Sequence, residues 1–156
     1  MVVESTLDLA YLGLFLGLRV NDTVRERGAA RGFRGMRDSH GYVVQHLIEA
    51  DRTITELAAR MEVSQQAASK SVAELVRRGI LESVSADDRR TRTIRLSKRG
   101  WEAVHFARNT RRRIERRLQR QVGLKRYQEA RSVLLICLKS LGGIGRVRAR
   151  RLRAPG

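Results

Sequence analysis

The strongest constraint on the fold of this chain is a pair of capped helices joined by a short turn. Thr53 begins the first predicted helix and has a glutamate three residues later, which is the spacing of a capping box. Ser64 caps the second helix, predicted over 65–78, and Gly79 suits the left-handed position that ends a helix. The turn between the helices, 61–64, has the length of the connection in a helix-turn-helix. The chain is therefore predicted to fold around this motif.

The outward face of the second helix is the first candidate binding surface. Its apolar positions recur at helical spacing and are predicted to pack inward: Ala68, Val72, Leu75 and Val76. The other positions carry amides, hydroxyls and an amine, which can bond base edges in a major groove of DNA. These candidate DNA-binding residues are Ser64, Gln65, Gln66, Ser69 and Lys70. The alternative is an ordinary solvated surface.

A β-hairpin is predicted after the second helix, because the hydrophobic period changes there. Residues 80–85 and 93–96 are β-prone, and the segment between them is rich in charge. A hairpin in this position is the wing of a winged helix-turn-helix. We therefore expect a mainly α fold with a small β-hairpin wing.

The charged tip of the predicted wing is the second candidate binding surface. Arg89, Arg90 and Arg92 can enter a minor groove, where the electrostatic potential of DNA is most negative. Asp87 or Asp88 would hold one of these arginines in place or order the turn. The alternative is a hairpin end that is only solvated.

An apolar N-terminal helix is predicted from a cap at Ser5 to about Arg27, followed by a glycine-rich linker over 27–35. One face carries Leu7, Tyr11, Leu14 and Leu18, and other apolar side chains add a second face. A helix that is apolar on two sides has to be covered on two sides, and in a small protein a partner chain supplies the extra cover. The sequence therefore predicts a homodimer.

The charge of the chain is strongly positive and unevenly distributed. The formal net charge is +17, and residues 108–156 hold 16 basic and 2 acidic side chains. Such a surplus implies a polyanionic partner, either nucleic acid or an acidic membrane surface. The longest apolar run, 7–18, is too short to span a bilayer and lacks the pattern of a signal peptide. We expect a cytoplasmic protein associated with a bacterial or archaeal nucleoid and not with a membrane.

The sequence offers little support for an enzyme. It shows no paired carboxylates in a plausible cleft, no nucleophilic triad, no phosphate-binding glycine loop and no metal-ligand spacing around His46 or His105. No catalytic residue, cofactor or metal is expected. The lone cysteine, Cys137, lies among apolar residues and is predicted to be a buried, inert thiol.

Residues 36–100 resemble the MarR family, the multiple antibiotic resistance regulators. The resemblance rests on "ITELAARMEVSQQAASKSVAELVRRGILESVSADDRRTRTIRLSKRG", which includes the wing rich in Asp and Arg and the "LSKRG" that follows it. It extends more weakly over about 5–141. This chain departs from the family at 37–40: it has "RDSH" where family members often have a start similar to Thr-Pro-Pro-Gln.

The resemblance implies a dimeric repressor or activator that binds palindromic DNA. The family's dimer interface uses the first helix and the last two, which adds Leu134 and Leu138 to the candidate dimerisation residues. Its small-molecule pocket lies between the dimer helices and the DNA-binding lobe. His40 is a candidate for facing that pocket, and the alternative is a polar residue at a helix terminus.

Four segments are expected. Residues 1–35 would form an N-terminal dimerisation helix and linker, 36–100 the winged helix-turn-helix lobe, 101–145 the C-terminal dimerisation helices, and 146–156 a flexible basic tail. The predicted function is that of a sequence-specific DNA-binding transcription regulator that acts as a repressor. The sequence does not identify a small-molecule effector. The alternative is a basic nucleic-acid-binding architectural protein that is indifferent to sequence.

Overall fold

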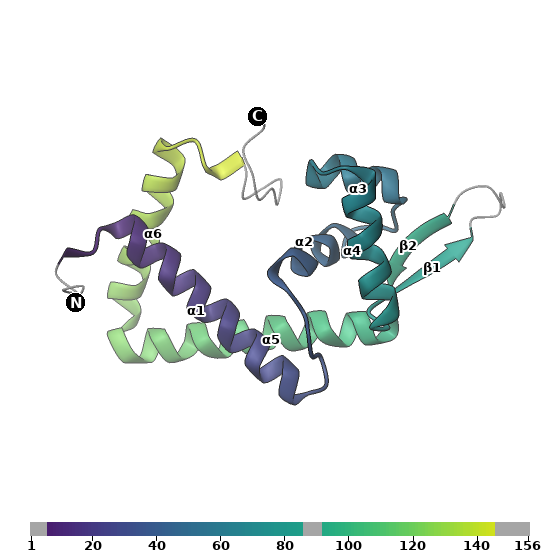
Figure 1. Cartoon of the computed structure of the whole chain (residues 1–156). Helices are drawn as coiled ribbons and strands as arrows, with labels where there is room; N and C mark the ends of the chain where they lie inside the picture. Colours follow the sequence, from purple (N-terminus) through teal and green to yellow (C-terminus); the bar gives the residue numbers. More distant parts are fainter. Residues whose placement is uncertain (1–5, 86–91, 146–156) are drawn as a thin grey trace.

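The computed structural model describes residues 6–85 and 92–145, which form a mainly helical fold with one β-hairpin. Three short helices and the hairpin lie at one end of the long helix α5, α6 lies at its other end, and α1 crosses α5 near its middle (Figure 1). The elements, in chain order, are α1 (Leu9–Ala30), α2 (Asp38–Leu47), α3 (Ile54–Met61), α4 (Gln65–Arg77), β1 (Leu81–Ser85), β2 (Arg92–Leu96), α5 (Lys98–Val122) and α6 (Leu124–Ser140).

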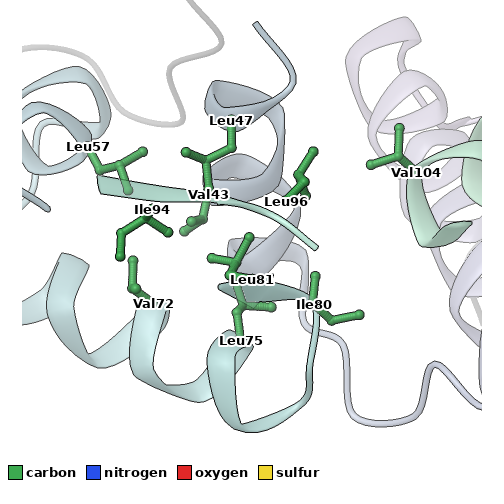
Figure 2. Packing of buried hydrophobic residues seen from close by; sticks show 10 residues of the cluster. All are labelled: Val43, Leu47, Leu57, Val72, Leu75, Ile80, Leu81, Ile94, Leu96 and Val104. Atoms are coloured by element: carbon green, nitrogen blue, oxygen red, sulfur yellow. The ribbon is translucent and has the colours of Figure 1, made fainter. Parts of the chain in front are cut away.

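The hydrophobic core belongs to the lobe made by α2, α3, α4 and the hairpin. Figure 2 shows its side chains converging from these elements, with Val104 of α5 at one edge. The strands are antiparallel and pair Leu81 with Leu96 at one end. Arg52 adds a short third segment to the sheet, because its backbone exchanges hydrogen bonds of 3.0 and 2.7 Å with Ile94. The core residues are Val43, Leu47, Leu57, Val72, Leu75, Ile80, Leu81, Ile94, Leu96 and Val104.

The predicted caps of α3 and α4 are confirmed, and α5 begins with a serine cap of the same kind. The Thr53 hydroxyl accepts a hydrogen bond from the Glu56 N–H at 3.2 Å, and the Glu56 carboxylate accepts one from the Thr53 N–H at 2.7 Å. Ser64 accepts from the backbone at the start of α4, and Ser97 does so at the start of α5. Gly79 has a φ of +67° after α4, as expected for a helix-ending glycine. These local signals position the two helices of the motif.

The prediction for the first helix was wrong at both ends. The helix begins at Leu9 because the Asp8 carboxylate accepts a hydrogen bond from the Tyr11 N–H at 2.8 Å, so Leu7 precedes it; Ser5 lies outside the described residues. The helix continues to Ala30, through part of the predicted linker. Gly28 is buried there, and a Cβ at this position would lie 3.6 Å from the ring of Phe106 on α5. Packing against α5 therefore extends the helix past the point where its sequence becomes glycine-rich.

Two side chains are less buried than predicted. Val76 is 39 % exposed, because it lies about 70° around α4 from the centre of the buried stripe formed by Ala68, Val72 and Leu75. Cys137 is half-buried rather than buried, since α6 has no buried residue in the single chain. Each described helix is too short or too polar to span a membrane.

Candidate nucleic-acid interface

The five predicted contact residues of α4 lie together on its first two turns. All of them are exposed, while Ala68 on the opposite side is buried. Ala58 and Ala68 are small and nearly fully buried, which is consistent with close packing of α3 on α4. The Gln65 amide donates to the Thr55 hydroxyl at 3.2 Å and so links the start of α4 to α3. The helix thus presents a polar face, free of acids over its first two turns, on a rigid support.

The wing is confirmed as a hairpin, but most of its predicted contact residues cannot be placed. Arg92 is exposed at the start of β2. Asp87, Asp88, Arg89 and Arg90 lie outside the described residues. Next to them in the hairpin, Arg95 donates to Glu82 on the paired strand at 2.6 Å. Arg95 is therefore engaged within the sheet, while Arg92 has no ion pair among the described residues.

A largely buried polar contact anchors α4 to α2 one turn after Lys70, and no sequence pattern predicted it. Nε2 of His40, on α2, lies 3.0 Å from the carboxylate of Glu74, the only acid in α4. Nδ1 of the same ring accepts a hydrogen bond from the Arg37 N–H at 3.2 Å, and the Arg37 guanidinium also donates to Glu74. With Nδ1 accepting, the neutral ring carries its proton on Nε2 and donates to Glu74. A single acid on the inner side of an otherwise acid-free helix was the signal available in the sequence.

The environment of His40 favours the neutral imidazole. Burial lowers the pKa of His40 from its usual 6.5, and the nearby guanidinium groups of Arg37 and Arg78 lower it further. The hydrogen bond from the Arg37 N–H requires an unprotonated Nδ1, which acts in the same direction. His40 is therefore a neutral link between α2 and α4.

Two arginines fasten the segment between α1 and α2 to the lobe. Arg78, at the end of α4, donates to the Arg34 carbonyl at 3.0 Å. Arg99, near the start of α5, donates to the Gly32 carbonyl at 2.7 Å and lies 5.5 Å over the ring of Phe33. The connection predicted as a linker is thus tied to the elements that surround the helix-turn-helix.

A cavity of about 390 Å³ lies between α1, α2 and α5. Its walls combine apolar side chains such as Phe33, Ile48 and Phe106 with arginines. One of these arginines is Arg37, which also reaches Glu74 on α4. His40 is not among the lining residues, so the structure places it in the α2–α4 contact and not at the cavity wall.

A second apolar surface lies on α1 and α6. Cβ atoms built at Gly13 and Gly17 would meet no atom of another element within 4 Å, so this part of α1 packs closely against nothing in the described part of the chain. The exposed apolar side chains of the two helices include all the predicted dimerisation residues except Leu7, which is half-buried. They are Leu9, Tyr11, Leu12, Leu14, Phe15, Leu16, Leu18, Leu124, Val133, Leu134, Ile136 and Leu138.

Comparison with known proteins agrees with this architecture. Residues 34–91 match the model of the MarR family. No curated protein matches the sequence. Among solved structures, the chain is similar to MepR, a transcription regulator of the Staphylococcus aureus multidrug efflux pump MepA, with 16 % identity over 86 % of this chain and 99 % of that chain and a TM-score of 0.68.

Two further structures show the same fold. YusO from Bacillus subtilis is 18 % identical over 84 % of this chain and 91 % of that chain, with a TM-score of 0.67. A MepR mutant from S. aureus bound to an oligodeoxyribonucleotide is 16 % identical over 86 % of this chain and 99 % of that chain, with a TM-score of 0.63. The predicted family resemblance and the predicted winged-helix fold are both confirmed.

Proposed function

Residues 34–91 match the model of the MarR family, and on this premise we propose that the chain is a dimeric, sequence-specific DNA-binding transcription regulator of a palindromic operator. The observation that carries the proposal is the exposed face at the start of α4. Its amides and hydroxyls are matched to base edges, and the lobe fixes its orientation through buried contacts. The DNA-bound MepR structure supports the proposal by fold similarity.

The proposed contact is symmetric. Two copies of α4 would enter successive major grooves about 34 Å apart, and each wing would reach the neighbouring minor groove. Gln66, Ser69 and Lys70 would contact bases or the adjacent phosphates. Arg92, together with Arg89 and Arg90, would contact the minor groove, with Asp87 or Asp88 orienting one of them.

The apolar surface of α1 and α6 supports the dimer. Large apolar side chains in a row along two helices are costly to leave in water, at about 25 cal/mol per Å² of apolar area. A second copy can cover both helices at once, and the open glycines of α1 would let helices approach closely. We propose that residues 1–35 and 101–145 form the dimerisation part and that 36–100 form the DNA-binding lobe.

The cavity supports regulation by a small molecule. We propose that an effector binds between α1, α2 and α5, because Arg37 is shared between the cavity wall and the contact with Glu74 on α4. Filling the space with Ala107→Trp should then abolish any change in operator affinity that an effector causes. We propose repression as the output, since a dimer seated on an operator occludes it.

Operator binding is tested by competition between selected genomic fragments and random duplex DNA. Gln66→Ala or Lys70→Ala should each weaken specific binding by about 1–3 kcal/mol and relax the preference at particular bases. Arg92→Ala should weaken binding to all sequences more evenly. The matched control is Gln128→Ala, which removes an exposed amide on α6. It should change neither the affinity for DNA nor the base preference. Equal affinity of the wild type for both classes of DNA would instead support the architectural alternative.

A further inference from the structure

A row of arginines follows the solvent face of α5. Arg108, Arg112, Arg116 and Arg120 recur every four residues, so neighbouring members are about 6 Å apart along the axis and the row is about 18 Å long. All four side chains are exposed. Ile114 and Leu118, on the opposite side of the helix, are half-buried. The row thus lies on the outer side of an amphipathic helix, and its first member, Arg108, also lines the cavity between α1, α2 and α5.

The charge on this face is not neutralised within the described part of the chain. Elsewhere, Arg19, Arg25, Arg37 and Arg95 pair with acids, whereas no member of the row forms an ion pair with a described residue. Residues 103–128 contain nine basic side chains and one acid, Glu115. The carboxylate of Glu115 accepts a hydrogen bond from the Tyr127 hydroxyl of α6. The acid nearest the row is therefore already engaged.

The position of the row separates it from the proposed operator contact. α5 extends from the winged lobe toward α6, and the row occupies the middle and the far part of this helix (Figure 1). The apolar side chains that the proposed dimer would cover lie on α1 and α6 and not in the row.

We propose that the arginine row is a second nucleic-acid surface, which binds the phosphate backbone of a duplex other than the operator. One strand of a duplex places a phosphate about every 3.4 Å along its axis, so a row about 18 Å long meets about five phosphates with four guanidinium groups. The contact is independent of sequence because it involves no base edges. The row contains no apolar side chain that would enter a lipid surface. This inference rests on the proposed function, since one end of the molecule holds the operator while the row holds a second duplex.

A bridging assay tests the inference with the full-length protein. A genomic fragment that the protein selects is immobilised, the protein is added, and a labelled duplex of random sequence is supplied. The wild type should retain the labelled duplex. The triple variant R112Q/R116Q/R120Q should retain it about tenfold less or worse, with operator affinity nearly unchanged. For each phosphate that the variant no longer neutralises, the slope of log K for the second duplex against log salt should fall by about 0.9.

Matched variants make the result specific to the row. K125Q/R126Q/R131Q removes the same charge from exposed sites on α6 and should behave as the wild type. Glutamine is a good helix former, and circular dichroism checks that both variants keep their helices. Protein that stays on the operator but captures no second duplex would overturn the inference, as would equal loss in both triple variants. Capture of phosphatidylserine vesicles in place of the duplex would also overturn it. Failure of the proposed function is distinguishable, because the protein would not then prefer the operator.

Discussion

Nε2 of His40 donates to the carboxylate of Glu74 over 3.0 Å, and this bond joins α2 to α4. His40 is 0 % exposed, and its other ring nitrogen accepts from the Arg37 N–H. Both ring nitrogens therefore have partners in the neutral form, as buried polar groups require. The contact fixes α4 one turn after Lys70 of its polar face, so its loss should affect both stability and the proposed DNA binding.

Replacing His40 with alanine should lower the free energy of unfolding by about 2–4 kcal/mol. The substitution leaves a cavity in the lobe and removes one partner of the Glu74 carboxylate. Urea denaturation at a fixed protein concentration measures the change, because a dimer is stabilised by mass action. The control is His105→Ala, an exposed histidine on α5, for which we expect a change within about 0.5 kcal/mol. Equal losses in both variants would show that the buried contact contributes nothing.

The stability of the protein should fall as the pH drops below 6.5, the usual pKa of histidine. The pKa of His40 is lowered in the folded state by burial and by the guanidinium groups of Arg37 and Arg78. Between this lowered pKa and 6.5, the unfolded chain binds a proton that the folded chain does not. The contribution of neutral His40 to stability is therefore fully present above pH 6.5, and it is lost as the pH falls through the lowered pKa of His40 in the folded protein.

Urea midpoints of the wild type and of His40→Ala, taken from about pH 8 to about pH 5, check this sign. The wild type should lose stability across the window, and the variant should lose less because the titrating group is gone. A wild-type midpoint that rises on acidification from pH 6.5 would contradict the prediction.

The elements that the sequence predicted well are those with local signals. The caps at Thr53 and Ser64 depend on residues three positions apart, so they are visible in the sequence alone. His40 and Glu74 are 34 positions apart and meet only when α2 packs on α4, so no local pattern announces their contact. The end of α1 was misplaced for the same reason, since burial against α5 overrides the helix-breaking tendency of Gly28.

The candidate site divides in the same way. The polar face of α4 follows from helical periodicity and was predicted residue by residue. The cavity needs three helices and the segment between α1 and α2, which no single stretch of sequence describes. The arginine spacing on α5 was visible, whereas its freedom from ion pairs required the positions of Glu115 and Tyr127.

Gly100→Ala should destabilise the lobe by about 3 kcal/mol or more. A Cβ at this position would lie 2.1 Å from the carbonyl oxygen of Ile80 and 3.0 Å from Leu96, and the carbonyl belongs to the backbone that leads into β1. Gly41→Ala is the matched control, because a Cβ there meets nothing within 4 Å inside a helix. It should raise stability by about 0.5–1 kcal/mol through the higher helix propensity of alanine. Thermal unfolding followed by circular dichroism gives both values, and equal melting temperatures for the two variants would refute the packing argument.

Leu14→Glu should convert the protein from a dimer to a monomer. Leu14 is 55 % exposed in the single chain and lies on the apolar face of α1. Burying a leucine contributes about 1.5–3 kcal/mol, and a symmetric interface contains the position twice, so the dissociation constant should rise by about a hundredfold or more. Sedimentation equilibrium over a range of protein concentrations measures it. Val76→Glu, an equivalent change at an exposed valine of the DNA-binding lobe, should leave the dimer intact. A wild type that sediments as a monomer at every concentration, or a dimer that survives Leu14→Glu unchanged, would mean that the α1 surface has some other occupant than a second copy of the chain.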